Sequence, residues 1–249
     1  MTWVRFVFWV RRLGGSLTPQ RVHRAELIDS SGLSVADLDQ SFSDIRWINR
    51  FLGGTAVIRS ELGALVSTAE SATLLDLGAG TADIPLSVIK RFRSKGGRIT
   101  ATALDTNQVV IEIAQRHANG NPDLRLLTGD AAKLPFPDGS FDFVTCSLTF
   151  HHFSDATAIC TLQEMDRVAR RALIVNDLRR AYLPAVLIWL LTRLKRMHRL
   201  TQHDGPLSVM RSRTLTEYRV LGTLAGFDQV QVRAHPFWRA ALVVVKMPA

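Results

Sequence analysis

Residues 72–80, with the sequence ATLLDLGAG, place a short apolar run directly before a glycine-rich turn. A run of this length that stops at Gly78 predicts a buried strand. The residues after the turn repeat apolar side chains at helical spacing (Ile84, Val88 and Phe92), which predicts a helix over 83–92. Glycine suits such a turn because it lets the backbone approach a ligand closely and adopts positive φ. The order strand, glycine turn and helix therefore predicts a ligand-binding turn, although a tight turn without a ligand has the same pattern.

Apolar runs alternate with helical patterns after this turn. We expect further strands at 98–104, 124–128, 141–147 and 171–175, and further helices at 107–117 and 155–168. Strands separated by helices are βαβ units, which build a parallel sheet with helices on both faces. Two closing runs, at 229–234 and 240–246, are close enough to form an antiparallel hairpin. The expected fold class is therefore α/β with seven strands.

The segments outside this pattern are helical by their spacing. Residues 20–66 lack strand signals, and we expect 1–66 to be a helical N-terminal extension and cap. Residues 67–249 would then form the main domain, with a helical lid insert at about 178–210. Within that insert we expect an apolar and basic helix at 184–200, followed by a polar turn at His203-Asp204-Gly205-Pro206.

Acidic residues accompany the ends of successive predicted strands. Asp76 lies in the first strand, Asp105 ends the second, and Asp130 follows the third. Ligands of open α/β sheets bind along the carboxyl edge of the strands, where a carboxylate can accept hydrogen bonds from ribose hydroxyls. A nicotinamide cofactor would favour a third glycine where this chain has Asp83. The set therefore indicates a nucleotide-like ligand of another kind.

Several segments together resemble the class I S-adenosylmethionine-dependent methyltransferases. They are residues 74–84 (LLDLGAGTADI), Leu104-Asp105, residues 129–136 (GDAAKLPF) and residues 137–142 (PDGSFD). The resemblance covers roughly residues 70–177. Within this class, the sequence is similar to the small-molecule branch that includes the quinone-biosynthesis methyltransferases (methyltransferase type 11-like). It implies a Rossmann-like, mostly parallel sheet and S-adenosylmethionine as cofactor.

The resemblance also implies roles for single residues. Asp76, Gly78 and Gly80 would line the methionine part of the cofactor, and Asp105 with Thr106 would hold the ribose. The remaining cofactor residues that it implies are Asp130 and Ala131 at the adenine, Ser147 near the sulfonium, and Asn49 and Arg59 on a helix over the methionine carboxylate. Ala82 departs from the family, which often has a third glycine at this place, and a small side chain should be tolerated there.

Candidate groups for the methyl acceptor follow the later strands. His151 and His152 come after the fourth strand, and an imidazole can take a proton from a hydroxyl near neutral pH; packing or helix capping explains them equally well. Asn176 and Asp177, at the end of the fifth strand, are either acceptor contacts or ordinary strand-end residues. Trp189 and His203 belong to the expected lid, where core packing and turn chemistry are the alternatives.

Composition limits the remaining interpretations. The 249 residues are 47% hydrophobic and 21% charged, which excludes an intrinsically disordered chain. The net charge of +9 is compatible with nucleic acid, an anionic membrane surface or an acidic ligand. Two cysteines, Cys146 and Cys160, cannot build a disulfide framework or a four-cysteine zinc site, and we assign no metal ligands.

The first 15 residues mix aromatic side chains with arginines, so they do not resemble a signal peptide. They are either a short basic amphipathic helix on a membrane surface, a segment packed on the core, or the product of a misplaced start codon. We expect a cytoplasmic protein, with peripheral membrane contact as an alternative.

The predicted function is methyl transfer from S-adenosylmethionine to a small apolar or aromatic acceptor, at a hydroxyl oxygen or a ring carbon. RNA methylation and a non-catalytic, cofactor-binding partner subunit are the alternatives.

Overall fold

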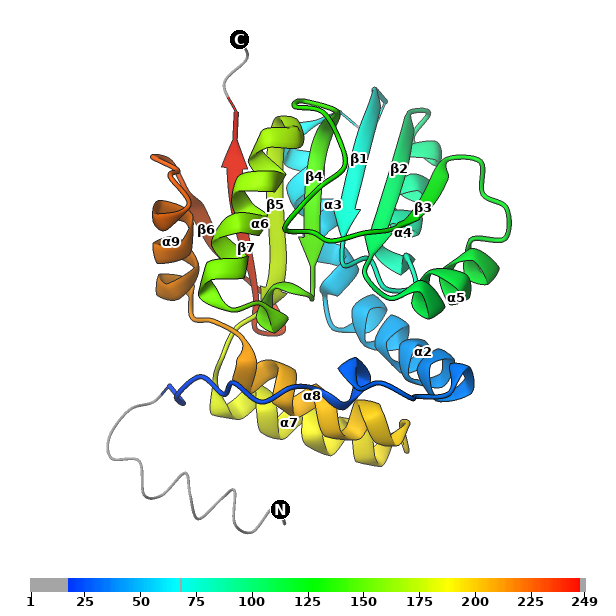
Figure 1. Ribbon diagram of the computed structural model, residues 1–249, viewed down its shortest axis with the longest axis vertical. Helices are drawn as coiled ribbons and strands as arrows, with labels where there is room; N and C mark the ends of the chain where they lie inside the picture. Colours follow the sequence, from blue (N-terminus) through cyan, green and yellow to red (C-terminus); the bar gives the residue numbers. More distant parts are fainter. Residues whose placement is uncertain (1–17, 68, 247–249) are drawn as a thin grey trace.

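A seven-stranded sheet organises the computed structural model, which describes residues 18–67 and 69–246 (Figure 1). The strand order is β3-β2-β1-β4-β5-β7-β6. The strands are β1 (Ser71–Leu77), β2 (Arg98–Asp105), β3 (Leu124–Thr128), β4 (Phe141–Ser147), β5 (Ala169–Leu178), β6 (Gln231–His235) and β7 (Arg239–Val245). The first five strands are parallel, whereas β7 pairs antiparallel with both β5 and β6. The predicted α/β class and the C-terminal hairpin are confirmed.

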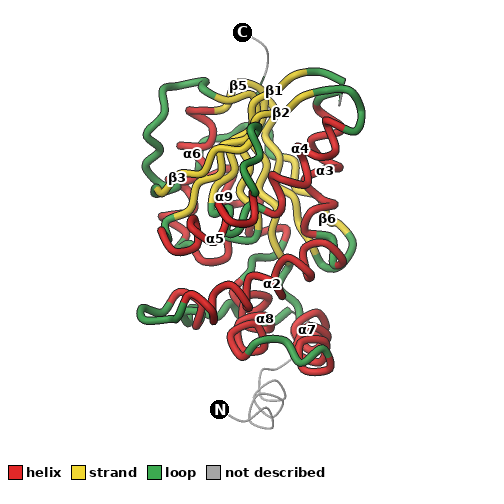
Figure 2. The backbone as a smooth tube through the Cα atoms, turned by 90° about the vertical axis from the view of Figure 1, so that its right-hand side faces the viewer, coloured by secondary structure: helices red, strands yellow, loops and turns green. Residues whose placement is uncertain are grey.

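Helices lie on both faces of this sheet and below the carboxyl ends of its parallel strands. Among the described residues they are α2 (Val35–Phe51), α3 (Gly54–Leu65), α4 (Asp83–Arg93), α5 (Gln108–Ala118), α6 (Asp155–Val168), α7 (Tyr182–Leu194), α8 (Arg199–Arg211) and α9 (Leu215–Leu224), with two short 3-10 turns, η1 (Leu27–Asp29) and η2 (Phe150–His152). Figure 2 shows α2, α7 and α8 grouped beneath the sheet, away from the helices beside it.

The alternation of side chains along the strands creates two apolar cores. In β1, Leu74 is buried with residues of α3 and α4 on one face of the sheet. Leu75 and Leu77 point to the opposite face, where they are buried with residues of α6 and α9. This period of two is what a strand covered on both faces requires. The parallel strands therefore form a rigid base whose carboxyl ends all meet at one edge.

The helix patterns predicted from the sequence agree closely with the structure over residues 83–168. Asn107 caps α5 by accepting hydrogen bonds from the backbone N–H groups of Val109 and Val110, as its position suggested. The fifth strand is longer than expected. Asn176, Asp177 and Leu178 continue it because they pair with β7, and the apolar run alone could not reveal this pairing.

The lid region differs from the prediction. The single helix expected at 184–200 is two helices, α7 and α8, because Arg196 adopts a left-handed conformation (φ 51°) between them. The prediction of a polar turn at 203–206 is wrong, since Asp204 and Pro206 lie inside α8. An added Cβ on Gly205 would lie 3.3 Å from Ile188 of α7. Glycine therefore serves close packing between the two helices here.

The beginning of the described chain also differs from the prediction. Residues 18–33, which we call the strap, are mostly extended and contain only the turn η1, so the helical pattern expected from residue 20 starts at α2. Figure 1 shows the strap crossing α8. The backbone N–H of Val22 donates to Met210 O (3.0 Å), which ties the strap to that helix. The predictions for residues 1–15 lie outside the described residues.

Candidate active site

A cavity of about 930 Å³ lies between the carboxyl ends of the parallel strands and the helices below them. Its upper wall comes from β1, β2, β4 and the loop after β3, and its lower wall from the strap, α2, α7 and α8. Ligand cavities commonly measure ~300–1,000 Å³, so this one has room for a cofactor and a small second molecule.

The glycine turn forms one end of the cavity. Gly78 and Gly80 have positive φ values of 62° and 54°. A Cβ on Gly78 would lie 2.4 Å from the side chain of Thr149, and a Cβ on Gly80 would lie 3.0 Å from Phe42 of α2. Side chains other than glycine would therefore clash at both places. Ala82 shares the left-handed conformation (φ 60°), which is strained for a residue with a Cβ.

Buried carboxylates gather beside this turn. Asp105 accepts hydrogen bonds from the backbone N–H groups of Gly80 (2.9 Å) and Asn107 (3.0 Å). Burial, helped by the charges of Asp83 and Asp105, raises the pKa of Asp76 to about 7, although the hydroxyl of Thr145 opposes this rise by donating to Asp76. Burial also raises the pKa of Asp83 and of Asp105. These three carboxylates, which we call the acidic edge, therefore favour a ligand that carries positive charge.

Other predicted cofactor residues also line this part of the cavity. They are Thr106, Asp130, Ala131, Ser147 and Asn49. Two of them keep a buried polar atom without a hydrogen-bond partner among the described residues, namely Oδ1 of Asn49 and Oγ of Ser147. Such atoms are costly unless a ligand or water satisfies them. Arg59 lies on α3 and is not among the described residues that line the cavity.

His151 lies at the opposite end of the cavity, on η2. Its Nδ1 is 2.8 Å from Asp177 Oδ1, its backbone N–H donates to Asp177 Oδ2 (2.7 Å), and its Nε2 is 3.4 Å from Glu26 Oε1. Burial alone would lower the pKa of His151, but the charge of Asp177 and hydrogen bonds to Asp177 and Glu26 raise it to about 9. His151 is therefore held firmly between two carboxylates.

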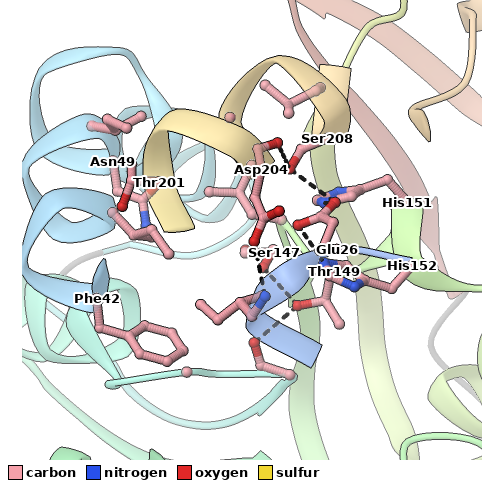
Figure 3. A pocket seen from close by; sticks show the side chains of 18 of the residues that line it. Glu26, Phe42, Asn49, Ser147, Thr149, His151, His152, Thr201, Asp204 and Ser208 are labelled. Atoms are coloured by element: carbon pink, nitrogen blue, oxygen red, sulfur yellow. Dashed lines mark hydrogen bonds and ion pairs between the residues drawn. The ribbon is translucent and has the colours of Figure 1, made fainter. Parts of the chain in front are cut away.

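His152 has a parallel arrangement, which Figure 3 shows. Its Nδ1 is 2.9 Å from Asp29 Oδ2, and its Nε2 is 3.6 Å from Glu26 Oε2. Burial opposes ionisation of Glu26, yet hydrogen bonding to His151 and the charges of His151, His152 and Arg211 keep its pKa below the usual value. Glu26 is only 4% exposed and lies between both imidazoles.

The strap brings Glu26 into the cavity because α8 holds it. The carboxylate of Asp204 accepts hydrogen bonds from the backbone N–H groups of Leu27 and Ile28 (2.9 Å each). The hydroxyl of Ser208 donates to Glu26 Oε1 (2.9 Å). Sequence reasoning missed all three polar side chains, since Glu26 lies in a segment without periodicity and Asp204 looked like a turn residue.

None of the four predicted acceptor residues is among the described residues that line the cavity. Asn176 is buried and donates from Nδ2 to Gly54 O (2.9 Å), and Asp177 is buried behind His151. Trp189 packs beneath the guanidinium of Arg193, and His203 contacts Asp204 through Nδ1 (2.6 Å). Asp177 therefore orients His151, which does line the cavity, whereas the side chains of Asn176, Trp189 and His203 contact other parts of the protein.

The part of the lower wall that α7 provides is apolar. The residues of α7 that line the cavity are Pro184, Leu187, Ile188, Leu190, Leu191 and Leu194. Leu187 and Leu190 are 45% and 44% exposed, which is unusual for leucine on a helix that faces a protein interior. This half of the cavity therefore suits an apolar molecule.

Comparison with known proteins identifies a methyltransferase domain in this chain. Residues 74–172 match a family model described as a methyltransferase domain. The uncharacterized methyltransferase YcgJ of Bacillus subtilis is 33% identical over 116 residues, which are 45% of this chain and 43% of that protein. A demethylmenaquinone methyltransferase of Thermotoga maritima is 32% identical over 126 residues, 50% of this chain and 51% of that protein. This chain thus spans about half the length of these relatives.

The fold is shared by a solved structure of an S-adenosylmethionine-dependent methyltransferase from Aquifex aeolicus, with a TM-score of 0.60 and 18% identity. The match covers 86% of this chain and 98% of that one. The sheet order, the glycine turn and the acidic edge are consistent with the class I S-adenosylmethionine-dependent methyltransferases that the sequence resembles. The family match identifies a methyltransferase domain at residues 74–172 of this chain, as the sequence motifs predicted. None of the described helices is long and apolar enough to cross a membrane.

Proposed function

We propose that this chain transfers a methyl group from S-adenosylmethionine to a small apolar or aromatic acceptor, at a hydroxyl oxygen or a ring carbon. One observation carries the proposal: a single cavity joins the glycine turn and the acidic edge to the apolar face of α7. A relative that is named a demethylmenaquinone methyltransferase supports an acceptor of this kind. Residues 1–66 would serve as a cap and residues 178–210 as a lid over the site.

The residues around the glycine turn fit the cofactor. The unsatisfied polar atoms of Asn49 and Ser147 and the acidic edge favour a polar, cationic ligand. S-adenosylmethionine supplies a methyl group on a positively charged sulfur, which needs no further activation. In this assignment Asp105 accepts from the ribose, and Asp130 with Ala131 contacts the adenine.

The rest of the chain would align the acceptor and exclude water. Leu187, Leu190 and Leu191 offer an apolar surface for the body of the acceptor. The polar cluster of Glu26, His151 and His152 offers the only imidazoles of the described lining, and it would contact the polar group of the acceptor. An acceptor that is apolar along its body and carries a hydroxyl group at one end matches both halves.

The test supplies the protein with cell extract and S-adenosylmethionine that carries an isotopically labelled methyl group. We expect the label in small molecules that partition into organic solvent, as mass spectrometry detects it. Label found in RNA and in no small molecule would overturn the proposal in favour of nucleic-acid methylation.

Two substitutions on the same helix make the test specific for the cavity. Leu187 lines the cavity, whereas Leu183 is 55% exposed and does not appear among the lining residues. We expect Leu187→Glu to lower label transfer by roughly tenfold or more, because it places a charge in an apolar site. Leu183→Glu should leave transfer unchanged, and equal losses in both variants would contradict the assignment of α7 to the acceptor.

A further inference from the structure

The cluster of Glu26, His151 and His152 has a geometry that acid–base chemistry alone does not require. One ligand atom from each of the three residues lies within 4.8 Å of the ligand atoms of the other two. Figure 3 shows both imidazoles directed toward Glu26, beside Ser208 of α8. Each Nε2 is closest to a different carboxylate oxygen, at 3.4 Å for His151 and 3.6 Å for His152.

The geometry points to a binding site for a divalent transition-metal ion, held by Nε2 of His151, Nε2 of His152 and the carboxylate of Glu26. Two ligands at metal-bond lengths of about 2.0–2.1 Å and a tetrahedral angle are roughly 3.4 Å apart. The nitrogen–oxygen separations in the cluster are therefore already close to those of a coordinated ion. Two imidazoles and one carboxylate are ligands typical of zinc, iron, manganese or cobalt and not of magnesium or calcium.

The far side of each imidazole supports this assignment. Nδ1 of His151 is 2.8 Å from Asp177 Oδ1, and Nδ1 of His152 is 2.9 Å from Asp29 Oδ2. Histidines that bind metals commonly donate from the other ring nitrogen to a carboxylate, which fixes the tautomer and orients the free nitrogen toward the ion. Both histidines here have that carboxylate, and both free nitrogens face the same third ligand.

The charge balance around the cluster also suits a divalent cation. The described groups in contact with it are the carboxylates of Asp177 and Asp29 and the guanidinium of Arg211, whose Nη1 is 3.7 Å from Glu26 Oε1. Coordination requires neutral imidazoles, so binding of the ion would release the second ring proton of any charged histidine. With both imidazoles neutral, three carboxylates, including Glu26, face one arginine. Two negative charges thus remain for the ion to neutralise, and burial makes their neutralisation favourable.

Three protein ligands leave open coordination positions on the side of the cavity. All three residues line the cavity that extends to the glycine turn. Sites with three protein ligands and an open position are typical of catalytic metal ions. A water molecule would occupy that position in the resting protein. An oxygen of the acceptor would replace it during turnover, and this last step alone rests on the proposed function.

The experiment titrates Co²⁺ into metal-free protein that carries no affinity tag, and it follows the visible absorption bands of the ion. We expect saturation at one ion per chain, without a sulfur charge-transfer band, and displacement by Zn²⁺. Absence of saturable Co²⁺ binding to the wild-type protein would overturn the inference whatever the variants do.

Variants locate the ion. Glu26→Gln and His152→Asn should each weaken Co²⁺ binding by roughly tenfold or more. His23→Ala, an exposed histidine on the same strap, should bind as the wild type does. Because His152 is partly exposed, His152→Asn tests the site even if Glu26→Gln unfolds. Binding that survives both substitutions would place the ion elsewhere and refute the assignment. Titration of S-adenosylmethionine into the same variants separates failure of the metal site from failure of the proposed function.

Discussion

The buried carboxylates beside the glycine turn have raised pKa values, so their ionisation is costly in the folded protein. Asp76 is 1% exposed and lies close to Asp83 and Asp105, which add to its electrostatic cost when all three are ionised. A protein tolerates such a cost where a cationic ligand repays it. The acidic edge is therefore a source of instability in the ligand-free protein.

Replacement of Asp76 by asparagine tests this cost. Burial raises the pKa of Asp76 from 3.8 to about 7. Between these two pH values the folded chain keeps a proton on Asp76 that the unfolded chain has already lost. The stability of the wild type should therefore fall as pH rises from about 4 to 7, by an amount on the order of 2–4 kcal/mol from this group. Asp76→Asn should lose that dependence, as denaturant unfolding at pH 5 and pH 8 measures.

Asp130→Asn makes the same substitution at an exposed carboxylate and supplies the control for the removal of one charge. Parallel pH profiles for the wild type and Asp76→Asn would show that Asp76 ionises normally and would contradict this account of the acidic edge.

At the scale of elements, most helices and strands could be predicted because their signals are local. The apolar periodicity and the capping residue Asn107 act within one element, and the structure confirms them. The break between α7 and α8 could not be predicted, since it depends on the left-handed Arg196 and on packing between helices. Asp204 to Pro206 read as a turn because proline and glycine are rare inside helices.

Pro206 makes α8 weaker than its length suggests. Proline has no N–H to donate to Gln202 O, four residues earlier, and this carbonyl accepts instead from Arg193 Nη1 at 3.5 Å. We expect Pro206→Ala to raise the free energy of unfolding by about 1–2 kcal/mol, because it restores a helical hydrogen bond. Denaturant unfolding monitored by circular dichroism measures the change.

Pro122→Ala is the matched control, because replacement of any proline makes the unfolded chain more flexible. Pro122 is exposed in the turn before β3, and its replacement should lower stability by up to about 1 kcal/mol. A loss of stability in Pro206→Ala of the same size as in Pro122→Ala would contradict the account of α8.

At the scale of the whole molecule, the cavity joins parts of the chain that are far apart in sequence. The lining near the glycine turn could be predicted, because Asp76, Gly78, Gly80 and Asp105 belong to one compact strand–turn–helix motif and the next strand. The contact between Glu26 and His151 could not be predicted, because it depends on hydrogen bonds between the strap and Asp204 and Ser208 of α8. Position at a strand end alone suggests acceptor contacts for Asn176 and Asp177, but Nδ2 of Asn176 donates to Gly54 O and the Asp177 carboxylate accepts from the backbone N–H of His151.

The most direct test of the central claim is a calorimetric titration of S-adenosylmethionine into the wild-type chain, Asp105→Ala and Asp138→Ala. Asp138 is an exposed carboxylate paired with Arg167 and serves as the control. We predict one binding site, an affinity reduced by about tenfold or more in Asp105→Ala, and no change in Asp138→Ala. Absence of binding to the wild type, or equal affinities for the wild type and Asp105→Ala, would contradict the assignment of this cavity to the cofactor.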